Sequence, residues 1–382
     1  FYPASMTQNR FNKFKAEWEN TFATLFGAPI SNIIAASESV APYYYHKAKK
    51  GATSTVVSVD IGGGTTDVLI VDKGEPKYLT SFRFAANTIF ADGYSYDSDS
   101  NGFVNKYKDI ITNQLETNNL RGLKAVLKSV LDKRVSTDVI AFLFSLASNK
   151  EIKKEKVEIN FAKMLADDNR GKYVVILFYV AIVYHIAKLM KAKGFDMPRH
   201  MTFSGNGSKV LNILSTNDAT LVRLTKIIFE EIYAQSYSID GLDIIRPANS
   251  KESTCKGGII LTPFQSQDYG EIKDMKTILI GTDNEKFADV HMTYNDVTEA
   301  DLDSVVDVIK EYIEFTFKLD KKFSFYDNFD VDRSIMNKVK DLCYRDIRTY
   351  LENGLAIKKS EIAQDGADDN LEETLFFYPL VG

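Results

Sequence analysis

The chain has 382 residues, which is enough for two or three domains or for the two lobes of one large fold. Its hydrophobic content of 45% and charged content of 26% are ordinary for a soluble globular protein, and a net charge of −5 gives no reason to expect nucleic-acid binding. Cys255 and Cys343 form no metal-spaced pair and favour a reducing, cytoplasmic location. The chain begins at Phe1 without a signal-like segment and stops in the apolar run Leu375–Val381, so we expect a fragment of a longer protein.

The start of the chain predicts a strand, a helix, a second strand and a second helix. Aromatic residues recur at helical spacing from Phe11 to Phe26, and Gly27 ends that helix. We interpret this aromatic stripe as core packing. Ile30–Ala36 then predicts a strand, and Val40–Lys50 predicts the next helix.

The stretch Val56–Asp72, VVSVDIGGGTTDVLIVD, predicts a β-hairpin with a glycine turn. Val56–Ile61 and Val68–Val71 are apolar runs rich in β-branched residues, which is typical of buried strands. The turn Gly62–Gly64 can take positive φ, and its amides can approach an anion closely because glycine has no Cβ. Asp60 ends the first strand with a carboxylate. This combination favours magnesium–phosphate chemistry, and the alternative is a tight hairpin with a solvated aspartate.

The string DIGGGTTDV resembles the second phosphate motif of the actin-like ATPase superfamily, which includes actin, the seventy-kilodalton heat-shock chaperones and sugar kinases. The resemblance implies an α/β fold, namely an actin-like ATPase (ribonuclease H-like) lobe, and the cofactors ATP or ADP with Mg²⁺. It also implies that Asp60 acts through Mg-bound water or the attacking water. The other residues that it implicates are Gly62, Gly63, Gly64, Thr65 and Thr66 at the phosphates, with Thr65 near the γ-phosphate and Asp67 supporting the turn.

A second carboxylate precedes the glycine hairpin. In the heat-shock chaperones a proline-alanine-phenylalanine segment is followed by a helix, a strand and an Asn-Glu-Pro turn into a crossing helix. Here Pro3-Ala4-Ser5-Met6 and Ser37-Glu38-Ser39 occupy similar places, although no proline follows Glu38. The resemblance makes Glu38 a catalytic carboxylate that reaches Mg²⁺ or its water. The alternative is a glutamate in the first turn of a helix, where the helix dipole favours it.

The segment after the hairpin predicts a third strand, Lys77–Phe84, and then a helical insertion. Ala85-Ala86-Asn87 stands where relatives usually carry a double glycine, and residues 94–102 are turn-like. Four segments between residues 103 and 170 show helical periodicity with charged flanks. We therefore divide the chain into residues 1–54 (end of the first lobe and crossing helix), 55–93 with 171–265 (core of the second lobe), 94–170 (helical insertion) and 266–382 (mainly helical accessory region).

The most apolar run is Tyr173–Met190, YVVILFYVAIVYHIAKLM. Its length would suit a membrane span. His185, Lys188, the tyrosines and the basic flanks favour a buried core helix instead, and we expect no membrane span. His185 is then interpreted as a core histidine with satisfied hydrogen bonds.

A second glycine segment follows the strand His200–Phe203 and precedes a helix. A strand, a glycine turn and a helix present amide donors to an anion or a sugar, although many α/β proteins contain such a turn. The segment resembles the family's adenosine motif, a glycine pair followed by a small residue, with Asn206 interrupting the pair. The resemblance therefore implies adenosine-binding roles for Gly205, Asn206, Gly207 and Ser208.

Residues 266–382 lie outside the resemblance. Thr298-Glu299-Ala300-Asp301 resembles a capping box at the start of an amphipathic helix. A second apolar stripe is expected to end at Gly354, and Asp365–Asp369 is expected to be an acidic linker. We interpret this tail as a helical accessory domain that packs on the lobe or binds a protein partner.

The family also needs a first phosphate hairpin with its own aspartate, and no D-x-G-T-like hairpin precedes the glycine hairpin. Stabilising a transferring phosphoryl group takes donors from both sides. The sequence thus predicts the nucleotide-binding lobe of a chaperone-like ATPase, with hydrolysis and ATP-driven switching only in an intact parent. The alternatives are an actin-like filament-forming protein of cell division or segregation, and a non-catalytic binding platform on the same fold.

Overall fold

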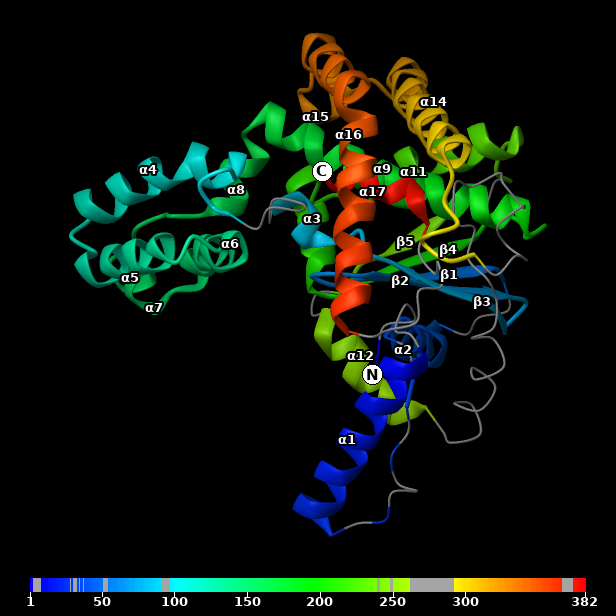
Figure 1. The fold of residues 1–382 in the computed structure, drawn as a ribbon. Helices are drawn as coiled ribbons and strands as arrows, with labels where there is room; N and C mark the ends of the chain where they lie inside the picture. Colours follow the sequence, from blue (N-terminus) through cyan, green and yellow to red (C-terminus); the bar gives the residue numbers. More distant parts are fainter. Residues whose placement is uncertain are drawn as a thin grey trace.

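A five-stranded mixed sheet lies at the centre of the protein (Figure 1). The computed structural model describes residues 1–2, 8–27, 29, 33, 35–36, 38–50, 54–90, 97–238, 241–247, 250–261, 292–365 and 374–382. The strand order is β3-β2-β1-β4-β5. β1 is antiparallel to β2 and parallel to β4, β2 is antiparallel to β3, and β4 is parallel to β5. The strands are β1 (Val56–Ile61), β2 (Thr66–Asp72), β3 (Glu75–Phe82), β4 (His200–Ser204) and β5 (Asp243–Ile245).

Helices cover both faces of this sheet, which explains why β1 and β2 are almost wholly buried. Successive side chains of a strand point to opposite faces. Val57, Val59 and Ile61 of β1 accordingly join the large core cluster, which includes α9 (Asn169–Ala192). Val56 joins a smaller cluster with α2 (Val40–Lys50). The predicted fold class, an α/β lobe with a helical insertion and a helical C-terminal extension, is confirmed.

Helix α9 is the central helix of the large core. Asp168 caps its N-terminus by accepting a hydrogen bond from the Arg170 amide at 3.2 Å. Among the described residues, α9 is the one helix that is long and apolar enough to cross a membrane. Of its most apolar 18-residue stretch, 83% is buried inside the protein. That burial is the environment predicted for a core helix.

The expectation that His185 has satisfied hydrogen bonds is wrong. Its side chain is fully buried, and neither ring nitrogen has a hydrogen-bond partner in the described part of the chain. The rings of Phe82 and Phe377 meet it edge-on at centroid distances of 5.3 and 4.9 Å, and Phe376 is stacked at 6.1 Å. Burial among these rings lowers the pKa of His185 to about 3. The imidazole is therefore neutral and packs as an aromatic ring.

The helical insertion lies to one side of the sheet (Figure 1). Its helices bury one apolar face each, and Arg134 joins the loop before α4 by pairing with Asp97 and Asp99 at 2.9 and 2.8 Å. The division of the chain into domains stays a prediction. The helices of the insertion are α4 (Gly102–Thr117), α5 (Arg121–Asp132), α6 (Ser136–Ser145), the 3-10 helix η2 (Leu146–Ser148), α7 (Lys150–Lys154) and α8 (Phe161–Ala166).

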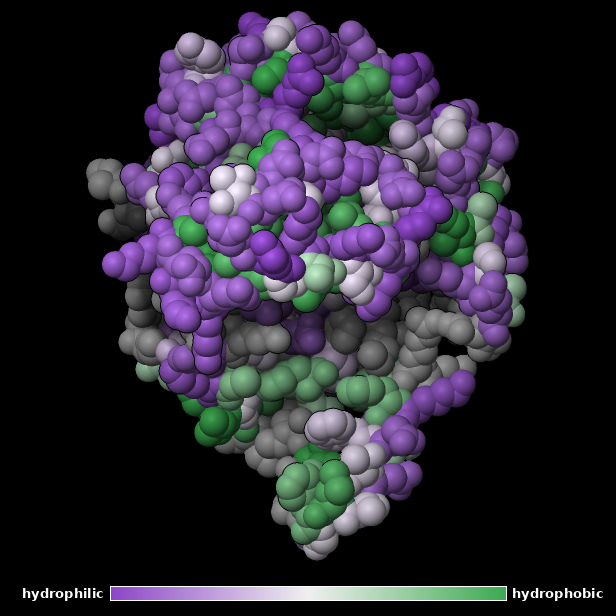
Figure 2. All heavy atoms as spheres, turned by 90° about the vertical axis from the view of Figure 1, so that its left-hand side faces the viewer, coloured by the Kyte–Doolittle hydropathy of each residue, from purple (hydrophilic) through white to green (hydrophobic). Residues whose placement is uncertain are grey.

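The prediction that the first aromatic stripe packs in the core is wrong. Helix α1 (Gln8–Phe26) extends away from the sheet in Figure 1. Phe14, Trp18 and Phe26 are 43%, 55% and 69% exposed because no other described element covers that face. In Figure 2 hydrophobic side chains gather at the lower end of the molecule, where α1 lies, whereas the insertion facing the viewer is hydrophilic. The expected strand over residues 30–36 falls mostly outside the described residues, as does the segment Pro3–Met6.

Two helices cross beneath the sheet with their backbones in close approach. They are α2 and α12 (Ser250–Ile260), and a Cβ at Gly257 would lie only 1.7 Å from the carbonyl oxygen of Ala41. Only glycine permits this crossing. It fixes the N-terminal end of α2, and with it Glu38, relative to the lobe.

The C-terminal helices share the core of the lobe. Phe377 stacks on Phe82 at 4.3 Å and on Phe84 at 4.8 Å. The predicted capping box is confirmed, since the Thr298 amide donates to the Asp301 carboxylate at 2.9 Å and the Thr298 hydroxyl accepts from the Asp301 amide. The elements are α14 (Glu299–Phe323), α15 (Phe325–Phe329), α16 (Arg333–Asp365), the 3-10 helix η5 (Leu375–Phe377) and α17 (Tyr378–Val381).

The expected helix end at Gly354 is also wrong, because α16 continues through it to Asp365. Gly354 is buried. An interior glycine costs an isolated helix about 1 kcal/mol, and the packing of α16 around this position offsets that cost. Of the expected acidic linker, the residues after Asp365 lie outside the described residues. Binding of a protein partner by this tail stays a prediction.

Candidate functional site

Asp60 is the next-to-last residue of β1, at the end of the sheet where β1, β2 and β4 lie side by side. In the strand register it stands opposite Asp67 of β2 and Ser204 of β4. Its side chain is buried, and the Ser204 hydroxyl donates to Oδ2 at 2.8 Å. Burial raises the pKa of Asp60 to about 7, the Ser204 hydrogen bond opposes this rise, and the charge of Glu38 adds to it. A carboxyl group whose pKa lies near 7 changes its ionisation strongly when a cation binds beside it.

Glu38 reaches this site from the face of the sheet that α2 covers, which is the face shared by Val56, Ser58 and Asp60 of β1. It lies two residues before α2, its side chain is half-buried, and its amide donates to the Tyr2 carbonyl at 3.1 Å. Its charge acts on the Asp60 carboxyl, so the two carboxylates are close in space although 22 positions separate them in the chain, from 38 to 60. The structure therefore brings together the two carboxylates that the sequence resemblance pairs.

The glycine turn between β1 and β2 offers two unused backbone donors. The Gly62 amide donates to the Thr65 carbonyl at 2.9 Å and closes the turn, so the phosphate contact expected from this amide is not open. Gly63 and Gly64 are exposed, and their amides donate to no acceptor among the residues that the structure describes. Nothing lies within 4 Å of a Cβ built at Gly64. Adjacent exposed amides of this kind form an anion-binding concavity.

Three residues after the turn hold it in place. The Thr65 hydroxyl donates to the Asp67 carboxylate at 3.2 Å, and Asp67 is fully buried. The Thr66 hydroxyl is buried and donates to the Phe84 carbonyl at 2.7 Å. That hydroxyl therefore supports the loop after β3, and the phosphate-binding role expected for Thr66 stays a prediction.

The second glycine segment packs directly on the end of the hairpin. A Cβ at Gly205, which has φ +79°, would lie 2.2 Å from the Ile61 carbonyl oxygen and 2.4 Å from Oδ1 of Asp60. A Cβ at Gly207, in the 3-10 helix η3 (Asn206–Val210), would lie 2.2 Å from the Gly62 carbonyl oxygen. Neither position can carry a side chain. The two glycine segments thus meet at one edge of the sheet.

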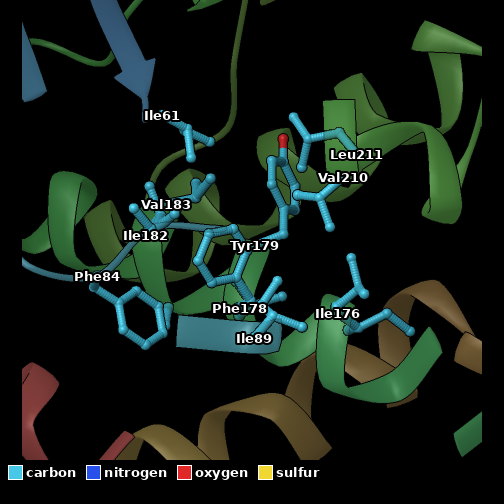
Figure 3. Packing of buried hydrophobic residues seen from close by; sticks show 14 of the residues in the cluster. Ile61, Phe84, Ile89, Ile176, Phe178, Tyr179, Ile182, Val183, Val210 and Leu211 are labelled. Carbon is cyan, nitrogen blue, oxygen red and sulfur yellow. The ribbon is translucent and has the colours of Figure 1, made fainter. Parts of the chain in front are cut away.

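Of the four residues implicated in adenosine binding, Asn206 is the one with an exposed side chain. Gly207 and Ser208 are buried, and the Ser208 hydroxyl donates to the Gly205 carbonyl at 2.7 Å. Beyond η3 the chain continues into α10 (Leu211–Leu214) and α11 (Asp218–Tyr233). In Figure 3, Val210 and Leu211 lie beside Tyr179, and Ile61 points towards Ile182 and Val183 of α9. The segment and the hairpin therefore rest on the same core.

Sequence reasoning missed two groups at this site. Ser204 is the last residue of β4, and the ends of neighbouring parallel strands meet at one sheet edge, so its closeness to Asp60 could have been predicted from the strand pattern. The start of α3 (Ala86–Phe90) carries no such signal. Its Ala86 and Asn87 amides donate to the Gly62 and Gly63 carbonyls at 3.3 and 2.8 Å.

The carboxylates fit a cation held mostly by other ligands. Among the described residues no group of three or more histidines, cysteines, aspartates or glutamates is placed to hold a metal ion. Asp60 and Glu38 provide two carboxylates. Mg²⁺ at phosphate sites typically uses one or two carboxylates and fills the other positions with water and phosphate oxygens. The donor set suits that mode of binding.

Comparison with known proteins adds little to this geometry. No protein-family model matches the chain. No curated protein matches it in sequence. Among solved structures, the chain is similar to component A of (R)-2-hydroxyglutaryl-CoA dehydratase from Acidaminococcus fermentans, with a TM-score of 0.25 and 13% identity over 61% of this chain and 70% of that chain. A likeness at this level carries no argument about function.

Proposed function

We propose that this chain binds a magnesium complex of ATP or ADP at the glycine hairpin, as the nucleotide-binding lobe of a chaperone-like ATPase. The observation that carries the proposal is the convergence of the free Gly63 and Gly64 amides with the buried carboxyl of Asp60 at one sheet edge. An anion and a cation each find a suitable partner there, and a nucleotide with bound Mg²⁺ supplies both.

Each residue has a defined part in the proposed complex. The Gly63 and Gly64 amides donate to phosphate oxygens. Asp60 and Glu38 accept hydrogen bonds from water molecules of the Mg²⁺ ion, which offsets the repulsion between the two carboxylates. The exposed backbone around Gly205 and Asn206 borders the nucleoside. Bound Mg²⁺ supplies charge neutralisation at the phosphates, and it lowers the pKa of Asp60 towards that of an ordinary aspartate.

The proposed site presents its donors from one side. Phosphoryl transfer is accelerated when charge on the transferred group is stabilised from both sides. We therefore expect this chain alone to bind nucleotide weakly and not to turn it over, and we assign ATP-driven switching to an intact parent. Turnover by the purified chain would contradict this assignment.

The test is calorimetric titration of Mg-ATP and Mg-ADP into the wild-type chain, into Asp60→Ala and into the control Asp341→Ala. Asp341 is exposed on α16, so its variant controls for the loss of one negative charge. Binding should be retained in the control and weakened by roughly tenfold or more in Asp60→Ala, because that variant loses a contact to a charged group. Equal affinities for wild type and Asp60→Ala, or no binding to the wild-type chain, would overturn the proposal.

A further inference from the structure

The first residues of α3 are attached to the glycine turn. The Ala86 and Asn87 amides donate to two carbonyls of the turn, those of Gly62 and Gly63. The Thr88 hydroxyl accepts from the Ala85 amide at 3.2 Å and fixes the start of this helix. The position of the start of α3 over the turn therefore depends on backbone groups and on Thr88. It does not depend on the side chain of Asn87.

That side chain lies over the turn itself. Nδ2 and Oδ1 of Asn87 would both be 3.5 Å from a Cβ built at Gly63, which is van der Waals contact. Asn87 is exposed, and its carboxamide makes no hydrogen bond within the described ranges of the chain. A polar group with a free donor and a free acceptor thus stands beside the two free amides of Gly63 and Gly64.

We propose that Nδ2 of Asn87 donates a hydrogen bond to the phosphate group that the Gly63 and Gly64 amides hold. The inference rests on the proposed nucleotide site and names a side chain that adds to the preference of the site for a phosphate-bearing ligand over a nucleoside. A carboxamide can rotate by half a turn, so its NH₂ group can face the ligand. The neutral amide is compatible with an anion, whereas a carboxylate at this position would repel it.

The geometry also separates this role from a structural one. The hydrogen bond between Asn87 and Gly63 uses the backbone amide, which every substitution except proline retains. Replacing the side chain therefore tests the ligand contact while the start of α3 keeps its anchors. Asn353, an exposed asparagine on α16, offers a matched position at which the same charge can be introduced.

The experiment is calorimetric titration of Mg-ATP and of adenosine into the full 382-residue chain and its variants. Asn87→Ala should weaken Mg-ATP binding by roughly tenfold, as expected for a hydrogen bond to a charged acceptor. Asn87→Asp should weaken it further, because a negative charge is added. Adenosine affinity should stay unchanged in both variants, and Asn353→Asp should behave as wild type.

Each outcome supports or contradicts the proposed contact between Asn87 and the phosphate. Wild-type affinity for Mg-ATP in both Asn87 variants would overturn the inference and leave the proposed function standing. Equal losses for Mg-ATP and adenosine would also overturn it, since they indicate a structural role. A wild-type chain that binds no nucleotide would overturn both. As a second readout, the side-chain amide signals of Asn87 in a ¹⁵N-asparagine-labelled chain should shift with Mg-ATP and stay in place with adenosine.

Discussion

Replacing Asp60 by asparagine should stabilise the folded protein at neutral pH. Burial raises the pKa of Asp60 from 3.8 to about 7. The unfolded chain therefore loses this proton more readily, and ionisation favours unfolding as the pH rises above 3.8. At roughly 1.4 kcal/mol for each pKa unit, the cost reaches about 4 kcal/mol at pH 7 and above. The substitution Asp60→Asn removes this cost and keeps an acceptor for the Ser204 hydroxyl.

The assay is urea unfolding followed by far-ultraviolet circular dichroism at pH 5 and pH 8, in buffer containing EDTA. Circular dichroism is the suitable probe because the single tryptophan, Trp18, is exposed on α1 and reports poorly on the lobe. The free energy of unfolding of Asp60→Asn should exceed that of wild type at pH 8 by up to about 4 kcal/mol. At pH 5 the difference should shrink by roughly half or more, since most of the cost arises above that pH.

The result that would refute this reasoning is a difference that does not change with pH, or a variant that is less stable than wild type at pH 8. Either would mean that the carboxylate is already ionised and compensated in the ligand-free fold. The control Asp341→Asn, an exposed aspartate on α16, should give the same free energy of unfolding as wild type at both pH values. Adding Mg-ATP should then raise the midpoint for wild type more than for Asp60→Asn.

Two other substitutions test the packing around the site. His185→Phe should stabilise the protein at low pH. The pKa of His185 falls from 6.5 to about 3 on folding, so the free energy of unfolding of the wild type is at its full value above pH 6.5 and declines below it. The loss is about 2 kcal/mol at pH 5, and the phenylalanine variant avoids it. A gain from this variant that is equal at pH 5 and pH 7.5 in urea unfolding would contradict the shift. Gly205→Ala should destabilise the fold by roughly 2 kcal/mol or more, because its Cβ would meet the Ile61 carbonyl and its φ is positive. A thermal melt matching that of wild type would contradict the close packing.

The glycine hairpin could be predicted from sequence because everything that defines it is local. Val56–Ile61 and Val68–Val71 are apolar, and the glycines between them supply the turn. Its contact with Gly205 depends on the pairing of β1 with β4, whose residues are 144 positions apart at Asp60 and Ser204. The carboxyl-end rule for parallel strands could have predicted that contact. The clash distances that exclude a side chain at Gly205 come only from coordinates.

The errors have one physical source, namely contacts between distant parts of the chain that the local sequence does not specify. Periodicity tells which face of a helix is apolar, and it does not tell what covers that face. The stripe of α1, which includes Trp18, is therefore exposed although its spacing is typical of a core helix. In the same way Gly354 continues α16 because tertiary packing overrides a local tendency to end the helix. His185 lacks the partners that a buried polar ring normally has, and only the positions of its three aromatic neighbours reveal it.

The site combines a costly buried carboxyl with backbone features that a bound ligand could use. A buried carboxyl with a pKa near 7 destabilises the fold at neutral pH, and Gly205, which packs on the hairpin, has a positive φ that other residues rarely adopt. Two adjacent amides in the turn donate to no described acceptor. A hairpin that served only to join β1 and β2 would need none of these features. A magnesium–nucleotide complex would remove the first by adding positive charge and use the free amides as donors, so its binding should offset much of the cost of the buried carboxyl. The presence of these features at one end of the sheet supports the nucleotide proposal more strongly than the glycine string does by itself.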